Sequence, residues 1–257
     1  MSSKIKQILN GVEEVFQFSS FRGHSFWNIP VNHKSLMIDL VANRCDFSAE
    51  FKKKFNCNVL SVEPNPDLKP NDPEFCSSID NIAITKSAGD FEFTISDNPE
   101  ASSLKSDIAN VFGTAKTIKD KGMTLKQYLK LKSIDTNISV LKVDIEGGEI
   151  DLLSNISPEE LKVIDQMTVE FHVFLDPSLE NCVISVIDRI KNLGFWVINC
   201  NYPYYDDVLF VNKRLFDVYG IRCVNIFAMK LIYIMRGYVH KLIGTHKSHR
   251  NIYDSNN

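Results

Sequence analysis

The chain lacks several features by which ligand-binding proteins are commonly recognised. Its six cysteines are scattered and include no C-x-x-C pair, which disfavours a zinc site or a disulfide framework and favours reduced thiols. It contains neither the dinucleotide fingerprint G-x-G-x-x-G nor the phosphate loop G-x-x-x-x-G-K-[ST], which argues against NAD and ATP. A net charge of −3 gives no general nucleic-acid signature.

Long apolar runs are also missing from the sequence. No run of signal-peptide length follows Lys4 and Lys6. We find no segment with the roughly 18 to 20 apolar residues that spanning a bilayer requires. These absences predict a soluble, cytoplasmic protein.

The residues that are present predict alternating strands and helices. Apolar periodicity and capping residues place strands at 35–40, 58–62, 79–84, 140–143, 167–171, 195–199 and 208–211, with a half-exposed hairpin strand at 91–95. They place helices at 48–55, 124–129 and 176–193, a helix start at Ser157, and an opening amphipathic helix before residue 17. Residues 102–120 are polar and irregular and predict a loop. The alternation predicts an α/β fold with a largely parallel, doubly wound sheet.

The strand at 140–143 ends in an unusual acidic segment, Asp144-Ile-Glu146-Gly-Gly-Glu149. Open α/β sheets bind their ligands at the carboxyl ends of their strands, so this segment is a candidate site. A solvated acidic turn is the plain alternative. We interpret Glu149 as a charge at a helix start rather than a catalytic group.

The first two strands each end in a single acidic residue. Asp39 closes the first strand, and Glu63, before Pro64, closes the second. An acidic side chain at the second position can accept hydrogen bonds from both hydroxyls of a ribose. A nucleoside without a pyrophosphate needs no phosphate loop, and S-adenosylmethionine is the commonest such cofactor. Glu63 as a turn cap and Asp39 as a helix cap remain the structural alternatives.

These segments together resemble the FkbM-type family of S-adenosylmethionine-dependent O-methyltransferases. The resemblance runs from about Lys34 to Phe216. The matching pieces are Ile38-Asp-Leu-x-Ala-Asn43, Val62-Glu-Pro-Asn65, Asn81-x-Ala83, Ser102-Ser-Leu104, Leu141-Lys-Val-Asp-x-Glu-Gly147, Glu149 and Glu170-x-His172. It implies a seven-stranded, Rossmann-like sheet with helices on both faces.

The resemblance also implies roles for single residues. Asp39, Asn43 and Phe47 would lie along the methionine part of the cofactor, Glu63 would bind the ribose, and Asn65 and Asn81 would flank the adenine. Ala83 also belongs to the implied cofactor-binding set. The catalytic set implied around an acceptor hydroxyl is Asp144, Glu146, Glu170 and His172. His172 or Asp144 would be the general base; a divalent metal held by the paired carboxylates is the less favoured alternative. Taken alone, His172 would more often be a core histidine that points into the sheet.

The chain departs from the family at two positions. Val41 and Cys45 stand where the family has glycines, which allow positive φ and close approach of the backbone to the cofactor. Valine tolerates that conformation badly. Either the loop takes another path, or cofactor binding is weakened or lost. We favour an active enzyme that methylates a hydroxyl of a glycan sugar or a secondary metabolite, over a non-catalytic protein that binds a glycan, nucleotide or partner.

The resemblance and the composition divide the chain into three parts. We expect a helical extension at 1–33, the methyltransferase domain at 34–216 and a basic, apolar helix and tail at 217–257. The last part can lie on an anionic membrane surface and make the protein peripheral there; a helix that covers the sheet, followed by a disordered tail, is slightly favoured.

Overall fold

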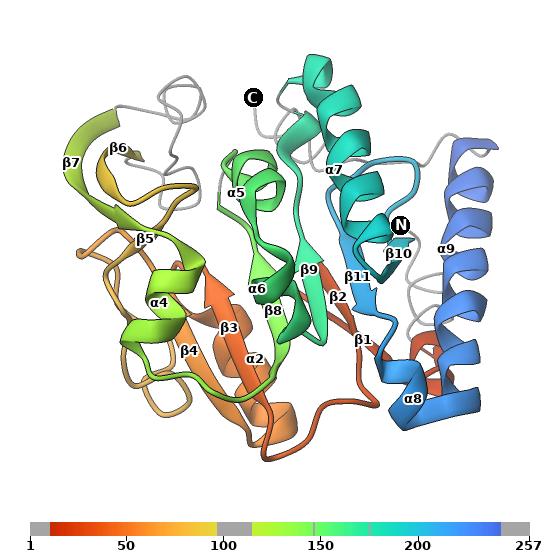
Figure 1. The fold of residues 1–257 in the computed structure, drawn as a ribbon. Helices are drawn as coiled ribbons and strands as arrows, with labels where there is room; N and C mark the ends of the chain where they lie inside the picture. The colour runs from red at the N-terminus through yellow and green to blue at the C-terminus, as the bar shows by residue number, and fades with distance from the viewer. Residues whose placement is uncertain (1–10, 97–114, 146, 175, 243–257) are drawn as a thin grey trace. The chain divides into compact units, whose positions relative to one another are not determined.

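The computed structural model describes residues 11–96, 115–145, 147–174 and 176–242 (Figure 1). It divides into two compact units, which we name the central unit, Asn32–Asp165, and the terminal unit, Met1–Val31 with Gln166–Asn257. Both contain helices and strands, so the protein is mixed α/β.

Three parallel strands form the middle of the central unit. Strand β3 (Leu36–Leu40) lies between β4 (Asn58–Val62) and β8 (Ile138–Val143) and pairs with both in parallel. Every residue of β8 is buried, as expected for a parallel strand covered on both faces. Helix α2 (Asp46–Phe55) connects β3 to β4 and packs against β4. The three predicted strand positions are confirmed.

A second sheet in the central unit consists of β5 (Ala83–Ile84), β6 (Gly89–Ser96) and β7 (Ala115–Met123). Strand β7 lies in the middle, antiparallel to β6 and parallel to β5. The predicted hairpin strand at 91–95 is therefore confirmed. The predicted loop at 102–120 is wrong for residues 115–120, which are paired strand; its first part, Ser102 to Leu104 included, lies outside the described residues.

Three helices complete the central unit. Helix α4 (Leu125–Leu131) begins with a capping box at Thr124, and α6 (Pro158–Lys162) begins with one at Ser157. Both predicted caps are confirmed. Helix α5 (Glu149–Asn155) follows the acidic segment directly.

The terminal unit has antiparallel strands. Strand β11 (Val208–Asn212) pairs antiparallel with β10 (Phe195–Asn199) and with β9 (Gln166–Val169). The expectation of a mostly parallel sheet fails here, because the short link from β10 to β11 contains no crossover helix. A hairpin of β1 (Phe18–Phe21) and β2 (His24–Trp27) stands within the stretch expected to be a helical extension.

Helices follow or connect these strands. A short 3₁₀ turn η3 (Pro177–Leu179) precedes α7 (Glu180–Asn192), which ends before Gly194 at φ 101° as predicted. After β11 come α8 (Leu215–Tyr219), η4 (Gly220–Cys223) and α9 (Val224–Leu242). The stretch Leu215–Leu242 is long and apolar enough to cross a membrane by length and composition. The expectation that no segment reaches this length is therefore wrong, although a single such helix is weak evidence for a span.

Candidate functional site

The loop between β3 and α2 has an unusual backbone. Val41, Asn43 and Cys45 have φ angles of 59°, 51° and 62°, all in the left-handed region. Asparagine adopts this region readily, but a β-branched valine there is an outlier. Such conformations cost about 1–3 kcal/mol each and persist only when surrounding contacts impose them. The loop thus keeps the backbone path that glycines would favour, without the glycines.

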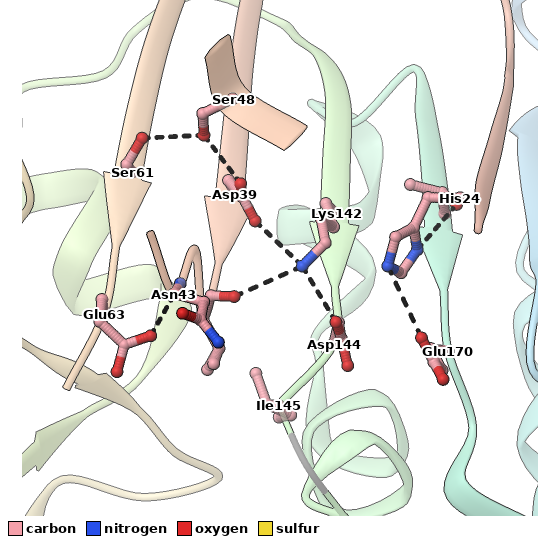
Figure 2. Close-up of polar contacts among 12 residues, drawn as sticks. His24, Asp39, Asn43, Ser48, Ser61, Glu63, Lys142, Asp144, Ile145 and Glu170 are labelled. Carbon is pink, nitrogen blue, oxygen red and sulfur yellow. Dashed lines mark hydrogen bonds and ion pairs between the residues drawn. The ribbon is translucent and has the colours of Figure 1, made fainter. Parts of the chain in front are cut away.

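Contacts from two neighbouring strands impose this conformation (Figure 2). Glu63, just after β4, accepts the backbone N–H of Asn43 at 2.9 Å through Oε2 and that of Asn65 at 2.8 Å through Oε1. Lys142, in β8, donates to the Val41 carbonyl at 3.4 Å. The Cys45 side chain is buried with Ala42 and Cys76. The loop is therefore held from both sides.

A buried chain of polar groups runs beneath the loop (Figure 2). The Lys142 Nζ atom lies 3.2 Å from the Asp39 carboxylate and 3.2 Å from that of Asp144. The other Asp39 oxygen accepts a 2.7 Å hydrogen bond from Ser48, which in turn accepts one of 2.9 Å from Ser61. The ammonium of Lys142 therefore occupies the place where a cation shared by Asp39 and Asp144 would sit.

Burial changes how two of these groups ionise. Desolvation raises the pKa of Glu63 to about 7, although the amides of Asn65 and Asn43 and the charge of Lys142 lower it. For Lys142, burial lowers the pKa, but the charges of Asp144 and Asp39 outweigh it and hold the pKa above its usual value. Lys142 therefore remains charged, whereas Glu63 titrates near neutral pH.

The other predicted cofactor residues lie close to this network. The Asn81 amide donates to the Glu63 carbonyl at 3.1 Å, and its contact with the Asn65 carbonyl is 3.5 Å. The Phe47 ring lies 6.0 Å from the Lys142 Nζ atom. Ala83 lies buried in β5. Hydrogen bonds thus join Glu63 to Asn43, Asn65 and Asn81, whereas Asp39 and Phe47 lie against Lys142.

The acidic segment after β8 is organised by Glu149. This buried side chain accepts the backbone N–H groups of Ile145 and Gly147, both at 3.0 Å and both through Oε1. Gly147 has φ 95°, and Gly148 is the N-cap of α5. Glu149 begins α5, as expected, and its carboxylate holds the turn that precedes the helix. Glu146, predicted to be catalytic, lies outside the described residues.

The remaining predicted residues, Glu170 and His172, belong to the terminal unit. Glu170 follows β9, and its carboxylate lies 3.8 Å from the ring of His24 in β2 (Figure 2). The other ring nitrogen of His24 is 3.5 Å from the Thr168 hydroxyl. His172 is buried at the start of the 3₁₀ turn η2 (His172–Phe174). The His24 ring is therefore a close polar neighbour of the Glu170 carboxylate.

Sequence reasoning missed Lys142, Ser61 and His24 and misplaced Ser48. The predicted helix at 48–55 starts at Ser48, but α2 begins at Asp46 with Cys45 as its N-cap, and Ser48 is buried on Asp39. A signal for Lys142 existed, because a lysine inside an otherwise apolar buried strand requires a charged partner. Nothing comparable marked the two serines.

Comparison with known proteins agrees with the resemblance. The family model described as the methyltransferase FkbM domain matches residues 39–197, more than half of the chain. No curated protein and no solved structure gives a significant match. The matched range includes the left-handed loop, Glu63, Lys142, the acidic segment and the Glu170-x-His172 pair. The chain belongs to the FkbM methyltransferase family.

Proposed function

We propose that this protein transfers a methyl group from S-adenosylmethionine to a hydroxyl group, on a sugar of a glycan or on a secondary metabolite. The proposal includes the seven-stranded, doubly wound sheet expected from the resemblance. The observation that carries it is the β3–α2 loop. Its strained path costs stability without an evident structural benefit, and such strain is typical of functional sites.

The residues of the central unit fit the nucleoside part of this cofactor. Each Glu63 oxygen already accepts one backbone amide, and a carboxylate oxygen has a second lone pair with which to accept a ribose hydroxyl. Asn65 and Asn81 would flank the adenine, and Ala83 belongs to the same cofactor-binding set. Their fixed positions around Glu63 make the site largely preorganised.

The loop itself would hold the methionine part. Asn43 and Phe47 would lie along it, whereas Asp39, with no exposed surface, would act through Ser48 and Lys142. The bound cofactor would supply an activated methyl group on a sulfonium. Positioning of the acceptor accounts for much of the acceleration in such a displacement.

The proton of the acceptor hydroxyl needs a destination. We assign the acceptor side to Asp144, Glu146, Glu170 and His172, with His172 or Asp144 as the proton acceptor. Asp144 pairs with Lys142, and Glu170 lies 3.8 Å from the His24 ring. Once an acceptor is found, His172→Ala should lower kcat and leave the affinity for the cofactor within a few-fold of the wild type. Unchanged kcat would remove His172 from this set.

Isothermal titration with S-adenosylmethionine and S-adenosylhomocysteine tests the cofactor assignment without an acceptor. Wild-type protein should bind both, and Glu63→Ala should abolish binding. Glu160→Ala is the matched control. The Glu160 carboxylate also accepts a backbone amide, that of Ser157, but it does so in the capping box of α6 and not in the proposed cofactor site. Binding that survives Glu63→Ala would contradict the ribose assignment.

One observation favours a second function, that of a non-catalytic protein that binds a glycan, nucleotide or partner. The Glu63 side chain is almost fully buried, with 1% of the residue exposed, and Val41 adds a branched side chain to the loop. In this case folded wild-type protein would bind neither ligand in the titration.

A further inference from the structure

The last helix of the terminal unit carries a continuous apolar stripe on its outer face. We define the stripe by residues spaced three or four apart, which places them along one side of α9 and the η4 turn before it. The members are Ile221, Val224, Phe227, Leu231, Met235, Tyr238 and Leu242. They are between 47% and 86% exposed. Large exposed apolar patches mark interaction surfaces.

The opposite face of α9 packs on the terminal unit itself. Its buried members are Ile226, Met229, Tyr233, Gly237 and His240. Helix α9 contacts β10, and the Tyr233 hydroxyl donates to Glu13 at 2.9 Å. A β-carbon at Gly237 would collide with the backbone oxygen of Tyr202, so the helix is seated closely. Two stripe members at its edge also touch this unit: the Phe227 ring lies edge-on to Trp196 at 5.4 Å, and the Tyr238 ring lies 5.5 Å from that of Tyr202. The stripe nevertheless remains about half exposed or more along its whole length.

The charged side chains of α9 itself are all basic. Val224–Leu242 contains no acidic residue, and Asp217 is the only one from Leu215 onward to Leu242. Lys230 and Lys241 are exposed and follow the stripe members Phe227 and Tyr238 by three positions, which places both lysines beside the same edge of the stripe. Arg222 is exposed before the helix begins. An apolar face bordered by cations is complementary to an anionic lipid surface.

From these observations we propose that the α9 stripe lies on the surface of an anionic phospholipid bilayer. The apolar side chains would enter the boundary between headgroups and acyl chains, and the lysines would lie by the lipid phosphates. The helix would lie on the membrane rather than cross it, because its other face stays packed on the terminal unit through Tyr233 and Gly237. The Arg236 side chain, which donates to the Cys200 carbonyl, adds to that packing. This inference does not depend on the proposed cofactor.

Vesicle flotation with the full chain tests this proposal. Vesicles of phosphatidylcholine with phosphatidylserine should carry the protein, and vesicles of phosphatidylcholine alone should carry much less. The double variant Leu231→Ser with Met235→Ser should weaken binding by about tenfold or more, because it removes two side chains from the centre of the stripe. Lys230→Gln with Lys241→Gln should weaken binding and reduce its dependence on salt.

The matched control is Val15→Ser with Leu131→Ser, which removes two apolar side chains of similar exposure outside the stripe. This variant should bind like the wild type. Circular dichroism and gel filtration would establish that each variant is folded. Absence of wild-type binding to anionic vesicles, or equal loss in both double variants, would overturn the proposal. So would a concentration-dependent dimer without vesicle binding that only the stripe variant disrupts, since a second copy would then cover the stripe.

Discussion

The central unit contains two loops, one after β3 and one after β8, that both hold backbone at positive φ and donate amides to a buried glutamate. In each, a buried glutamate gathers two backbone amides: Glu63 those of Asn43 and Asn65, and Glu149 those of Ile145 and Gly147. The loop after β8 uses a glycine at its left-handed position. The loop after β3 places three non-glycine residues there.

The difference shows what fixes each loop. Gly147 needs little help to reach φ 95°, because glycine has no β-carbon to clash with the backbone. Valine has no such freedom: at φ 59° the Val41 carbonyl accepts from Lys142 and the amide two residues later donates to Glu63, contacts that can hold the strained conformation. One loop is set by local preference and the other by tertiary contacts.

Removing Lys142 should have the largest effect. Lys142→Met would leave Asp39 and Asp144 without their shared cation and release the Val41 carbonyl. Loss of one partner of a buried ion pair costs about 3–5 kcal/mol, so we expect a loss of that size in the free energy of unfolding. Urea denaturation measures it. Adding Asp39→Asn should recover part of the loss; a further, fully additive loss would contradict the coupling.

Ionisation of Glu63 should make stability depend on pH. Burial raises its pKa from about 4.5 to about 7, so the folded protein binds this proton more tightly than the unfolded chain does. The contribution to stability is therefore greatest below pH 4.5 and is lost as the pH rises toward 7, by up to a few kcal/mol. Urea denaturation across this range should show a shallower fall for Glu63→Gln. Asp207, whose burial raises its pKa to about 6, acts equally in both proteins. Identical slopes would contradict the assignment.

Amide substitution should affect the two glutamates unequally. Glu63 uses one oxygen for each backbone amide, so Glu63→Gln turns an amino group toward one of them and should cost about 1–3 kcal/mol. Glu149 uses a single oxygen for both, which the glutamine carbonyl can replace, and Glu149→Gln should cost less. The two midpoints in urea give the comparison. Equal losses of stability would show that the effect comes from the lost charge and not from how many carboxylate oxygens each glutamate uses.

Exchanging glycine and non-glycine residues should have the smallest effects. Val41→Gly would remove most of the strain of a left-handed valine, a gain of about 1 kcal/mol once the added freedom of the unfolded chain is subtracted. Gly147→Ala should lower stability by a similar amount. Cys45→Gly should give no gain, because it also removes a side chain buried with Ala42 and Cys76. A destabilised Val41→Gly would mean that the loop is not strained.

The sequence predicted most strands, because short apolar runs bounded by polar residues were clear at β3, β4, β8, β10 and β11. It also predicted the caps at Thr124 and Ser157, since these depend on neighbouring residues alone. It missed the β1–β2 hairpin, whose two strands have four residues each and little alternation. Antiparallel pairing in the terminal unit depends on which strands become neighbours, and no local pattern encodes that.

The acidic residues of the candidate site could be predicted, because carboxylates directly after buried strands stand out in the sequence. Glu63 and the acidic segment were identified from position, but their partners were not, because backbone amides carry no sequence signal. The sequence did not show whether Val41 would take the left-handed conformation or the loop would follow another path. The contacts that hold this loop come from Lys142, 101 positions away, and from Glu63.

We propose that the strained β3–α2 loop holds the cofactor. The decisive experiment is a crystal structure of the protein grown with S-adenosylhomocysteine. The ribose hydroxyls should lie on Glu63, with Val41, Asn43 and Cys45 still at positive φ. A ligand bound elsewhere, or a loop that abandons this conformation to admit it, would show that the loop does not hold the cofactor.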